Sequence, residues 1–535
     1  MTEIAHPDRL AKVERLRSEG IDPYPARGVA ATPIEDLHAQ AGTAEEPGPG
    51  IGQEVTIAGR MLGLRDFGKL IFSPVRDRTG RIQVGMQKNR LADWWPLRKT
   101  LDGGDLVGIT GELGHTQKGE VTVWATKVEL LAKSVAPPPE KFHGLADKEA
   151  RYRRRYVDLW ASEGVMEVFV KRSRVLSEIR AYLQSEGYLE VETPTLHPIS
   201  GGATARPFIT HHNSLGRDLY LRIAPELYLK RLIVGGMERV FEIARNFRNE
   251  GVSIRHNPEF TMLELYEAQA DYNRMMEVTE AIFERTAIAV NGSTQVEFRG
   301  ETYDLKAPFE RRSYIEMFRE FNECEFDDQD AVRARAKELG IHDSGEYPKL
   351  MNDVFEETCE PQLRGPVFLI DYPIEICPLA KAKPSDPRVA ERFEVFIASM
   401  ELGNAFSELN DPAEQERRFE EQVASKDPET PGEVDIDYVQ ALEFGMPPAG
   451  GLGIGIDRLV MVLTGQESIR DVLLFPAMRP SASSEAAEGE AAEGEAKESA
   501  GSTGSTGSAE STGSAESTGS AESTESTADS KSLAD

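Results

Sequence analysis

The sequence predicts an α+β protein with two folded parts and a disordered C-terminal tail. The first part is a five-stranded β-barrel, because five short segments near the N-terminus alternate apolar and polar residues with period two. The second part mixes helices with antiparallel-looking strands, since helical and strand patterns follow one another there without a regular β-α-β order. The tail is predicted because the end of the chain has almost no large apolar side chains.

Length and composition limit the class of protein. The chain has 535 residues, too many for one hydrophobic core, and its 39% hydrophobic and 28% charged residues are typical of soluble globular proteins. It has no run of eighteen apolar residues and no apolar leader between Met1 and Arg27, so we expect a cytoplasmic protein without a membrane partner. The three cysteines, Cys324, Cys359 and Cys377, are too few and too scattered for a disulfide framework or a metal cage.

The net charge of −30 argues against a protein that coats nucleic acid non-specifically, because phosphate binding is driven by basic surface. We expect no DNA partner. A specific contact with another nucleic acid would have to use a local basic patch such as residues 151–155. The excess of carboxylates also suits a saline cytosol, where salt screens their repulsion.

Residues 1–50 are predicted to form a short helix and a connecting arm. Leu10, Val13 and Leu16 have helical spacing, and Gly20 ends the helix. The stretch that follows is rich in alanine, proline and glycine, which favours a loop up to the first strand.

Residues 51–133 are predicted to fold as a closed barrel of the OB type. Barrels of this type bind single-stranded nucleic acid by stacking bases on aromatic rings. Phe72 and Gln83, on neighbouring strands, are the candidates for this contact, although the barrel segment taken alone favours Phe72 as part of the barrel core. The five strand patterns, separated by glycine and aspartate turns, occupy residues 55–60, 70–75, 81–84, 106–110 and 121–124.

A linker over residues 134–165, stiffened by a run of three prolines, leads to the second folded part over residues 166–480. This part begins with a helical pattern over 169–183, a strand over 188–191 and a glycine-rich loop over 200–203. No P-loop or Rossmann fingerprint follows a strand, so neither of these nucleotide sites is expected.

A hairpin over residues 241–266 gives the strongest indication of a ligand site. Its first strand alternates apolar residues with Glu242, Asn246 and Arg248, as expected when one face is buried and the other lines a site. Arginines, carboxylates, a histidine and an aromatic ring suit a nucleoside triphosphate, because guanidinium groups bind phosphate and a ring stacks on the base. Taken alone, these residues could equally form a salt-bridged surface hairpin.

Two later segments complete the predicted site. Glu394 and Glu401 bring carboxylates to a basic hairpin, and Mg²⁺ bridging these carboxylates to substrate phosphates would balance the charges. In residues 450–461, alternate glycines on an apolar strand leave room for a flat ligand, and Arg458 begins the following helix. The glycines could also reflect close packing of a strand on a helix.

Two other segments carry few chemical signals. Residues from about 285 to 375 are predicted to be a solvated helical insertion beside the site, on the pattern around Phe326. Residues 481–535 are predicted to be a disordered acidic tail, because their serine, glycine, threonine and glutamate repeats cannot bury enough apolar surface to offset chain entropy.

Taken together and in this order, the motifs resemble the three signature motifs of class II aminoacyl-tRNA synthetases. Residues 186–194 resemble motif 1, residues 247–250 with their downstream arginine–histidine loop resemble motif 2, and the glycine run ending in Arg458 resembles motif 3. The resemblance covers residues from about 8 to 480 and implies a mixed, mainly antiparallel catalytic sheet flanked by helices. Within the class, the barrel resembles that of the subgroup that charges lysine, aspartate or asparagine. Four further segments resemble the lysyl-tRNA synthetase family; these are residues 224–228, 255–261, 403–408 and 475–480.

The resemblance implies an ATP site. Arg248 and Arg458 would be the catalytic residues, with Arg248 on the α-phosphate and Arg458 with His256 on the β- and γ-phosphates. Glu250 would bind the adenine amino group and Phe260 the ring face. Several magnesium ions would accompany ATP, held by Glu394 and Glu401. The full set of implied ATP contacts is Arg248, Glu250, His256, Asn257, Phe260, Glu401 and Arg458.

The resemblance also implies a lysine pocket. Carboxylates must surround a buried ammonium, because an unpaired buried charge is prohibitive, whereas an aspartate pocket would need the opposite sign. Any one of these glutamates could instead form a surface ion pair. The implied lysine contacts are Gly202, Glu226, Glu264, Tyr266, Asn404, Phe406 and Glu408.

The implied partners are ATP, L-lysine, tRNA(Lys) and a second copy of the chain. The barrel would read a uridine-rich anticodon with Phe72, Gln83 and Glu120, and the helix over 169–183 with Pro194 would form the homodimer interface. Three alternatives remain: an aspartyl- or asparaginyl-tRNA synthetase, a lysyltransferase acting on a protein, and a non-catalytic tRNA-binding relative. The last of these should have lost key arginines or carboxylates of the site, which this chain retains.

Overall fold

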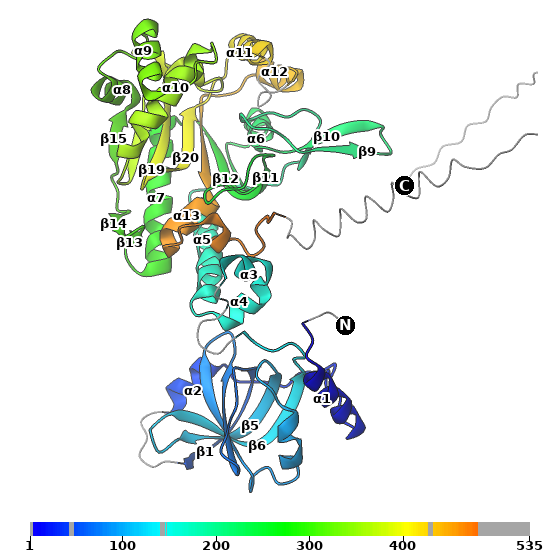
Figure 1. Ribbon diagram of the computed structural model, residues 1–535. Helices are drawn as coiled ribbons and strands as arrows, with labels where there is room; N and C mark the ends of the chain where they lie inside the picture. The colour runs from blue at the N-terminus through cyan, green and yellow to red at the C-terminus, as the bar shows by residue number, and fades with distance from the viewer. Residues whose placement is uncertain (1–3, 42–47, 140–144, 146, 426–431, 480–535) are drawn as a thin grey trace, which may run out of the picture. The chain divides into compact units, whose positions relative to one another are not determined.

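The computed structural model describes residues 4–41, 48–139, 145, 147–425 and 432–479 (Figure 1). Contacts divide the chain into Met1–Ala477 and Met478–Asp535. The predicted acidic tail over 481–535 lies outside the described residues. Among the residues that are described, no helix is long and apolar enough to cross a membrane.

The N-terminal barrel is confirmed as a closed five-stranded barrel. Its strand order is β1-β5-β6-β4-β3, and a further antiparallel pairing of β1 with β3 closes the circle, while the short β2 adds to β3 at the edge. The elements are β1 (Gly48–Met61), β2 (Arg65–Asp66), β3 (Leu70–Arg76), β4 (Arg81–Gln87), the 3-10 turn η1 (Trp95–Thr100), β5 (Leu106–His115) and β6 (Val121–Ala132).

Two helices precede the barrel, and one of them was predicted as loop. Helix α1 (Pro7–Ser18) lies where the sequence predicts it, but α2 (Ile34–Ala41) replaces part of the predicted arm. Ile34 and Leu37 are fully buried in the barrel core, and the backbone amide of Ile34 donates to Asp77 Oδ2 at 3.0 Å. Helix α2 is too short to show a clear helical period, and its partner Asp77 lies in a loop far along the chain. The residues of α2 alone therefore predict neither the helix nor this contact.

The predicted linker contains helices α3 (Lys148–Arg153) and α4 (Arg155–Ala161). Its basic run is only partly available as a basic patch, because Arg153 and Arg154 are exposed but Arg151 and Arg155 are paired within the segment. Arg155 is fully buried and its Nη1 lies 2.7 Å from Asp158 Oδ2, while Arg151 Nε lies 3.0 Å from Oδ1 of the same carboxylate. These arginines therefore stabilise the segment internally.

An eight-stranded sheet forms the centre of the second part, with the order β15-β16-β19-β20-β21-β12-β11-β7. The outer pairs β15/β16 and β11/β7 are parallel and the other pairings are antiparallel, so the mixed, mainly antiparallel sheet is confirmed. Its strands are β7 (Leu189–Glu190), β11 (Arg239–Phe247), β12 (Glu259–Ala268), β15 (Glu310–Ser313), β16 (Val367–Ile370), β19 (Arg392–Ile397), β20 (Met400–Ser407) and β21 (Ala449–Gly455).

Three helices cover one face of this sheet: α5 (Val165–Ser185), α7 (Tyr272–Asn291) and α13 (Ile456–Thr464). In Figure 1, α7 lies beside β19 and β20, and α7 and α13 contact β20 and β21. Because side chains of a strand alternate between faces, Leu263 and Leu265 pack against these helices while Glu264 and Tyr266 point to the opposite face. The chemically active residues are therefore presented on the face that the helices leave free.

Residues 285–375 are not a solvated insertion. They supply β15 and β16 at the edge of the main sheet, and their helices bury a second core that contains Tyr314, Phe318 and Phe326, the last with 3% of its surface exposed. The acidic residues beside Phe326 misled the sequence interpretation. The other elements are β13 (Gln295–Phe298), β14 (Glu301–Asp304), α8 (Tyr314–Asn322), α9 (Gln329–Leu339), α10 (Tyr347–Thr358) and η2 (Glu360–Gln362).

Of the remaining elements, α14 (Ile469–Val472) packs against α13 and α5 on the helix-covered face. Strands β8 (Leu196–His197), β10 (Arg217–Leu221) and β9 (Ile209–His212) pair as a small sheet, and β17 (Ala382–Lys383) pairs with β18 (Asp386–Ala390). The other helical segments are α6 (Glu226–Val234), η3 (Ile374–Ile376), α11 (Pro412–Ser425) and α12 (Ile436–Glu443).

Candidate active site

The strand register places the functional residues in rows that run across the free face of the sheet. Each row takes one residue from each of four neighbouring antiparallel strands, β12, β21, β20 and β19. One row is Glu264, Gly453, Asn404 and Glu394, and the next is Tyr266, Gly451, Phe406 and Arg392. Residues that are far apart in sequence are thus brought to a common surface.

Glycines in these rows create the space of the site. A Cβ at Gly451 would lie 2.0 Å from Glu408 Oε1 and 2.5 Å from the ring of Tyr266, so no side chain fits there. Gly202, in the loop facing the sheet, has a φ of +87° and its Cβ would meet that of Glu226 at 3.2 Å. The alternate glycines therefore open the floor of a cavity, as the sequence predicts, and do more than allow a strand to pack on a helix.

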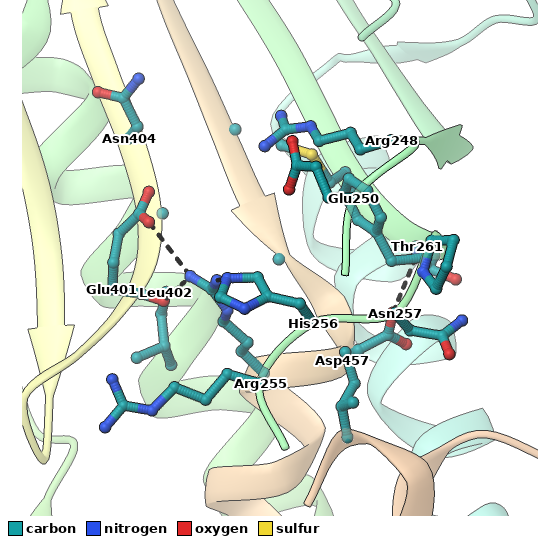
Figure 2. Close-up of a pocket in the computed structure, with 18 of the residues that line it drawn as sticks. Arg248, Glu250, Arg255, His256, Asn257, Thr261, Glu401, Leu402, Asn404 and Asp457 are labelled. Carbon is teal, nitrogen blue, oxygen red and sulfur yellow. Dashed lines mark hydrogen bonds and ion pairs between the residues drawn. The ribbon is translucent and has the colours of Figure 1, made fainter. Parts of the chain in front are cut away.

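A first cavity of about 230 Å³ lies between the β11–β12 hairpin, β20 and the start of α13 (Figure 2). All seven residues of the predicted ATP set line it: Arg248, Glu250, His256, Asn257, Phe260, Glu401 and Arg458. Figure 2 shows Arg248 and Glu250 side by side at one side of the space, with Glu401 across from them. We call this space the phosphate cavity.

Arg248 is a buried cation in the wall of the phosphate cavity. Burial lowers the pKa of its guanidinium, and the carboxylates of Glu250, Glu401 and Glu264 counteract this effect. Its Nε is buried and has no hydrogen-bond partner among the described residues, while the guanidinium carbon lies 5.2 Å from the ring centre of Phe260. A buried donor without a partner indicates a place for an anionic ligand.

A chain of polar contacts joins β20, α13 and the hairpin loop. Arg458 Nη1 donates to the backbone carbonyl of Glu401 at 2.7 Å and lies 3.1 Å from its carboxylate, and Arg458 Nη2 lies 3.1 Å from His256 Nε2 (Figure 2). Because a guanidinium can only donate, His256 Nε2 must accept and its Nδ1–H faces Ser253 Oγ at 3.0 Å. Burial and the charge of Arg458 lower the pKa of His256, which keeps this neutral tautomer at pH 7.

Sequence reasoning missed several residues that support this cavity. Arg255 and Asp457 line it, and the buried carboxylate of Asp457 lies 2.6 Å from Arg172 Nη1 and accepts from the backbone amide of Thr261 at 2.8 Å. Asp457 thus fastens the first turn of α13, which carries Arg458, to α5 and β12. Its position directly before Arg458 was visible, but nothing local indicated its partners.

A second cavity of about 290 Å³ adjoins the first, and we call it the acidic cavity. It shares Arg248, Met262, Glu401, Asn404 and Gly453 with the phosphate cavity. Six of the seven residues in the predicted lysine set line it: Gly202, Glu226, Glu264, Tyr266, Asn404 and Phe406. The seventh, Glu408, is not among the lining residues, but its Oε1 lies over Gly451 on the cavity side of the sheet.

Two of the predicted lysine contacts already hold an ammonium of the protein itself. Lys230 Nζ lies 2.6 Å from Glu226 Oε1 and forms an ion pair with Glu408 Oε2, and all three side chains are buried. Sequence reasoning missed Lys230 because a lysine is normally exposed. Its spacing of four residues from Glu226 on an otherwise apolar stretch of α6 was the available signal.

Burial strongly raises the pKa of two carboxylates at the acidic cavity. Burial and the neighbouring Glu226 raise the pKa of Glu264 to about 8, against the opposing charge of Arg248, and the Tyr266 hydroxyl donates to Glu264 Oε2 at 3.3 Å. Burial raises the pKa of Glu408 to about 8 as well, although Lys230 lowers it. A cavity with such groups favours a ligand that brings positive charge.

The predicted metal ligands, Glu394 and Glu401, both line the acidic cavity. Arg392 Nη2 lies 2.6 Å from Glu394 Oε1 and the Tyr372 hydroxyl donates to Oε2 at 2.7 Å. Burial and the charge of Glu401 raise the pKa of Glu394 to about 7 against the effect of Arg392. Within the described ranges no group of three or more metal-binding side chains forms a closed cage. Two neighbouring carboxylates nevertheless fit Mg²⁺, which is held by one or two carboxylates together with substrate phosphates.

The predicted anticodon residues lie on the barrel: Phe72 on β3, Gln83 on β4 and Glu120 directly before β6. Phe72 on β3 is half-buried and contacts Phe67 and Trp124 edge to face, at ring-centre distances of 6.3 and 5.9 Å. Gln83 is buried, with its amide between Arg65 Nη2 at 3.1 Å and Thr122 Oγ1 at 3.2 Å, whereas Glu120 is exposed. An aromatic patch with polar neighbours is therefore present, but the Gln83 amide already has protein partners.

Comparisons with known proteins agree with this description. Residues 147–479 match the family model for class II tRNA synthetases (D, K and N), and residues 55–131 match the model for the OB-fold nucleic acid binding domain. A lysine–tRNA ligase of Carboxydothermus hydrogenoformans is 50% identical over 480 residues, covering 88% of this chain and 97% of the relative. Lysine–tRNA ligases of Moorella thermoacetica (50% identical, 88% of this chain and 97% of the relative) and Xanthomonas oryzae (49%, 89% and 96%) are similar to the same extent.

The matches to both models and to these relatives extend over the barrel, the linker and the sheet that carries the two cavities. They cover nearly the whole of each relative, so the likeness is not restricted to one domain. The chain therefore belongs to the class II aminoacyl-tRNA synthetases, in the family of its lysine–tRNA ligase relatives.

Proposed function

We propose that the chain is a lysine–tRNA ligase, which activates L-lysine with ATP and transfers it to the 3′ end of tRNA(Lys) during translation in the cytoplasm. The observation that carries the proposal is the pair of adjoining cavities of different character. The phosphate cavity has arginines and a histidine, and the acidic cavity has Glu226 and Glu264 in its wall with Glu408 next to Gly451 of its floor. Their shared wall at Arg248 would bring an α-phosphate next to an amino acid carboxylate.

In the first step, a carboxylate oxygen of lysine attacks the α-phosphorus of ATP. The bond from this phosphorus to the bridging oxygen breaks, pyrophosphate leaves, and lysyl-adenylate remains. Arg248 would bind the α-phosphate, where negative charge gathers, and Arg458 with His256 would hold the β- and γ-phosphates. Such a step needs placement and charge stabilisation more than a covalent nucleophile on the protein.

The base and the metal complete this arrangement. Glu250 would accept from the adenine amino group, and Phe260 would stack on the ring. Glu394 and Glu401 would hold Mg²⁺ with the phosphates, and the ion would supply additional neutralisation of phosphate charge. The protein's own part is to orient these carboxylates, which Arg392 and Tyr372 do for Glu394.

In the second step, a hydroxyl of the terminal ribose of the tRNA attacks the carbonyl carbon of lysyl-adenylate and AMP leaves. The barrel would bind the anticodon, with Phe72 stacking on a base and Gln83 and Glu120 near base edges. For Gln83 this requires its amide to exchange its contacts with Arg65 and Thr122 for contacts with RNA.

We also propose that the chain acts as a homodimer. Leu189, Leu196 and Ile209 are large apolar side chains with 43 to 63% of their surface exposed; Leu189 lies within the motif 1 segment, and Leu196 and Ile209 lie on the small sheet that follows it. Apolar side chains exposed together in this way support an interface with a second copy.

Charging of tRNA tests the proposal. Purified protein with ATP, Mg²⁺ and unfractionated tRNA should attach radiolabelled lysine, but not aspartate or asparagine, to acid-precipitable RNA. Oxidation of the tRNA with periodate destroys the terminal ribose diol and should abolish the incorporation. Incorporation of aspartate or asparagine would identify the other members of the class, and label in protein instead of RNA would indicate a lysyltransferase acting on proteins.

A further inference from the structure

Lys230 occupies an unusual place for a lysine. Its side chain is fully buried on α6, in contact with Glu226 and Glu408, and its Nζ lies 5.2 Å from the ring centre of Phe406 and 5.9 Å from that of Tyr266. All four neighbours belong to the predicted lysine set. Lys230 therefore contacts the same groups that an incoming lysine would contact, but from within the protein.

Lys230 contacts one carboxylate oxygen of each glutamate, and the other oxygen of each remains for a ligand. It takes Oε1 of Glu226 and Oε2 of Glu408. Oε1 of Glu408 is buried, has no hydrogen-bond partner among the described residues and lies next to Gly451 in the cavity floor. A buried carboxylate oxygen without a partner is costly, so this atom is oriented for a ligand that donates.

The charges around the acidic cavity otherwise balance in pairs. Glu394 pairs with Arg392 at 2.6 Å, and Glu401 pairs with Arg458 at 3.1 Å. Arg248 lines both cavities, and its charge lowers the pKa of Glu264. The remaining groups are the carboxylates of Glu226, Glu264 and Glu408 and the ammonium of Lys230.

The carboxylate of free lysine would balance the guanidinium of Arg248. The three carboxylates and the ammonium of Lys230 then leave two negative charges when all four groups are ionised. Free lysine carries two ammonium groups, one on its side chain and one on its α-carbon, which match these two charges. A cavity with three uncompensated carboxylates would hold an excess of buried negative charge even with lysine bound, which is unfavourable in a desolvated site.

We propose that Lys230 is a positioning residue for the amino acid substrate: its ammonium holds Glu226 and Glu408 at the floor of the acidic cavity and sets the charge of that cavity to match the two ammonium groups of lysine. This inference rests on the proposed function and deepens it. Lys230 acts through the two glutamates and does not contact the reacting atoms.

Removing the ammonium should change how the cavity titrates. Lys230 lowers the pKa of Glu408, so without it Glu408 stays protonated to a higher pH. A protonated carboxyl binds an ammonium poorly, so lysine binding should then improve only as the pH rises. The titratable and charged groups around Lys230 and its partners are Glu226, Glu408, Glu264, Glu242, Tyr266, Tyr438, Arg231 and Arg248.

The test is amino-acid-dependent exchange of pyrophosphate into ATP, with KM for lysine and KM for ATP measured between pH 6.5 and 9. We expect Lys230→Met to raise the KM for lysine roughly tenfold or more at pH 7. The fall of this KM with rising pH should begin at a higher pH in the variant than in the wild type. The KM for ATP should change by less than about threefold, because Lys230 lines no part of the phosphate cavity. Lys230→Arg, which keeps the charge, should restore part of the loss.

Lys133 provides a matched control. It is a fully buried lysine of the barrel between two carboxylates, with Nζ 2.6 Å from Asp102 and 2.8 Å from Asp105. Lys133→Met should lower the melting temperature as Lys230→Met does, but leave the KM for lysine and its pH dependence as in the wild type.

The outcomes separate the two proposals. Wild-type protein without lysine-dependent exchange would overturn the proposed function itself. Active wild type together with a folded Lys230→Met variant that keeps the wild-type KM for lysine and its pH profile would overturn the role of Lys230 alone. If Lys230→Met does not fold, Lys230→Arg and Lys230→Gln are compared: equal KM values for lysine in these two variants would also contradict the role of its charge.

Discussion

Arg458 connects the parts of the phosphate cavity at the level of single side chains. Its guanidinium contacts the carbonyl and carboxylate of Glu401 on β20 and the imidazole of His256 in the hairpin loop. Asp457, the preceding residue, is fixed by Arg172 and by the backbone of Thr261. The cation is therefore held in place before any ligand arrives, and little reorganisation is needed when phosphate charge develops.

We expect Arg458→Ala to slow formation of lysyl-adenylate by about a hundredfold or more, because a preorganised cation next to the leaving group is lost. Binding of tRNA should change by less than about twofold, since Arg458 is remote in sequence from the barrel and its partners, Glu401 and His256, also lie in the catalytic part. Single-turnover kinetics and filter binding measure the two effects. Normal adenylate formation in the folded variant would remove Arg458 from the phosphate site.

A substitution of Glu226 tests whether the acidic cavity binds lysine. Glu226→Gln should lower kcat/KM for lysine in pyrophosphate exchange by about a hundredfold, because it removes one carboxylate from the cavity and one partner from the buried ammonium of Lys230. A matched control is Glu421→Gln, which breaks an exposed pair with Arg417 at the same spacing of four residues on a helix. Exposed pairs contribute little, so the control should keep wild-type kinetics. Full activity of Glu226→Gln would contradict the assignment of the cavity.

The pKa values of the cavity carboxylates predict a pH dependence of binding. Burial raises the pKa of Glu264 and of Glu408 to about 8, so both carry protons at pH 7 in the lysine-free protein. An ammonium ligand stabilises their ionised forms, so binding releases protons and affinity rises as the pH approaches about 8. Calorimetry in two buffers with different ionisation enthalpies should detect this release. Binding enthalpies that do not depend on the buffer, with a flat affinity from pH 6 to 8, would contradict it.

At the level of elements, the antiparallel register of four strands builds the floor of the site. Because β12, β21, β20 and β19 pair without interruption across the rows of the site, residues spaced by two along each strand meet on one face. Strand β21 contributes only glycines to those rows, so its neighbours can extend their side chains above it.

Gly451→Ala should therefore act on the acidic cavity alone. Its Cβ would overlap Glu408 Oε1 and the Tyr266 ring, so we expect the KM for lysine to rise by about tenfold or more and the KM for ATP by less than about threefold. Gly365→Ala is the control, because no atom lies within 4 Å of the Cβ it would add. Equal effects of Gly451→Ala on both KM values would indicate general damage to the sheet and not a filled pocket.

The elements that the sequence predicts correctly are those with a regular period. The hairpin of β11 and β12 and the five barrel strands alternate clearly, and the structure contains them. Helix α2 was missed because it is short, so its residues show almost no helical period, and because Asp77, which stabilises its first turn, is distant in sequence. The core around Phe326 was missed because acidic neighbours obscured a buried aromatic residue.

The same distinction applies to the site. The strand pattern and the motif resemblance predicted which side chains gather at the two cavities, since strand alternation and the spacing of residues within a motif are local properties. They could not predict what each side chain contacts. Lys230 and Asp457 illustrate this, because their roles depend on partners from other elements that only the folded chain brings close.

At the level of the whole molecule, the barrel and the catalytic sheet have separate tasks. Phe72 lies in an aromatic patch with Phe67, which is 68% exposed, and with Trp124. Rings that are partly exposed on a barrel of this type suit stacking on unpaired bases. The acidic net charge of the chain does not prevent this, because stacking requires a ring face more than a cationic surface.

Phe72→Leu should weaken binding of tRNA(Lys) by roughly tenfold, since stacking on one base contributes about 1–3 kcal/mol. Pyrophosphate exchange in the absence of tRNA should be unchanged, because no residue of the barrel lines either cavity. Phe72→Tyr, which keeps the ring, should bind tRNA as the wild type does. If Phe72→Leu lowers the melting temperature but leaves tRNA binding intact, Phe72 is barrel core.

The central claim is that adjoining cavities bind lysine and ATP for direct reaction. The most direct measurement is exchange of labelled pyrophosphate into ATP by the wild-type protein without tRNA, with each amino acid supplied separately. The account predicts exchange with lysine at least about a hundredfold above that with aspartate or asparagine, because the acidic cavity opposes a carboxylate side chain and provides no ammonium partner for an amide. Exchange driven by aspartate or asparagine, or none with lysine, would contradict it.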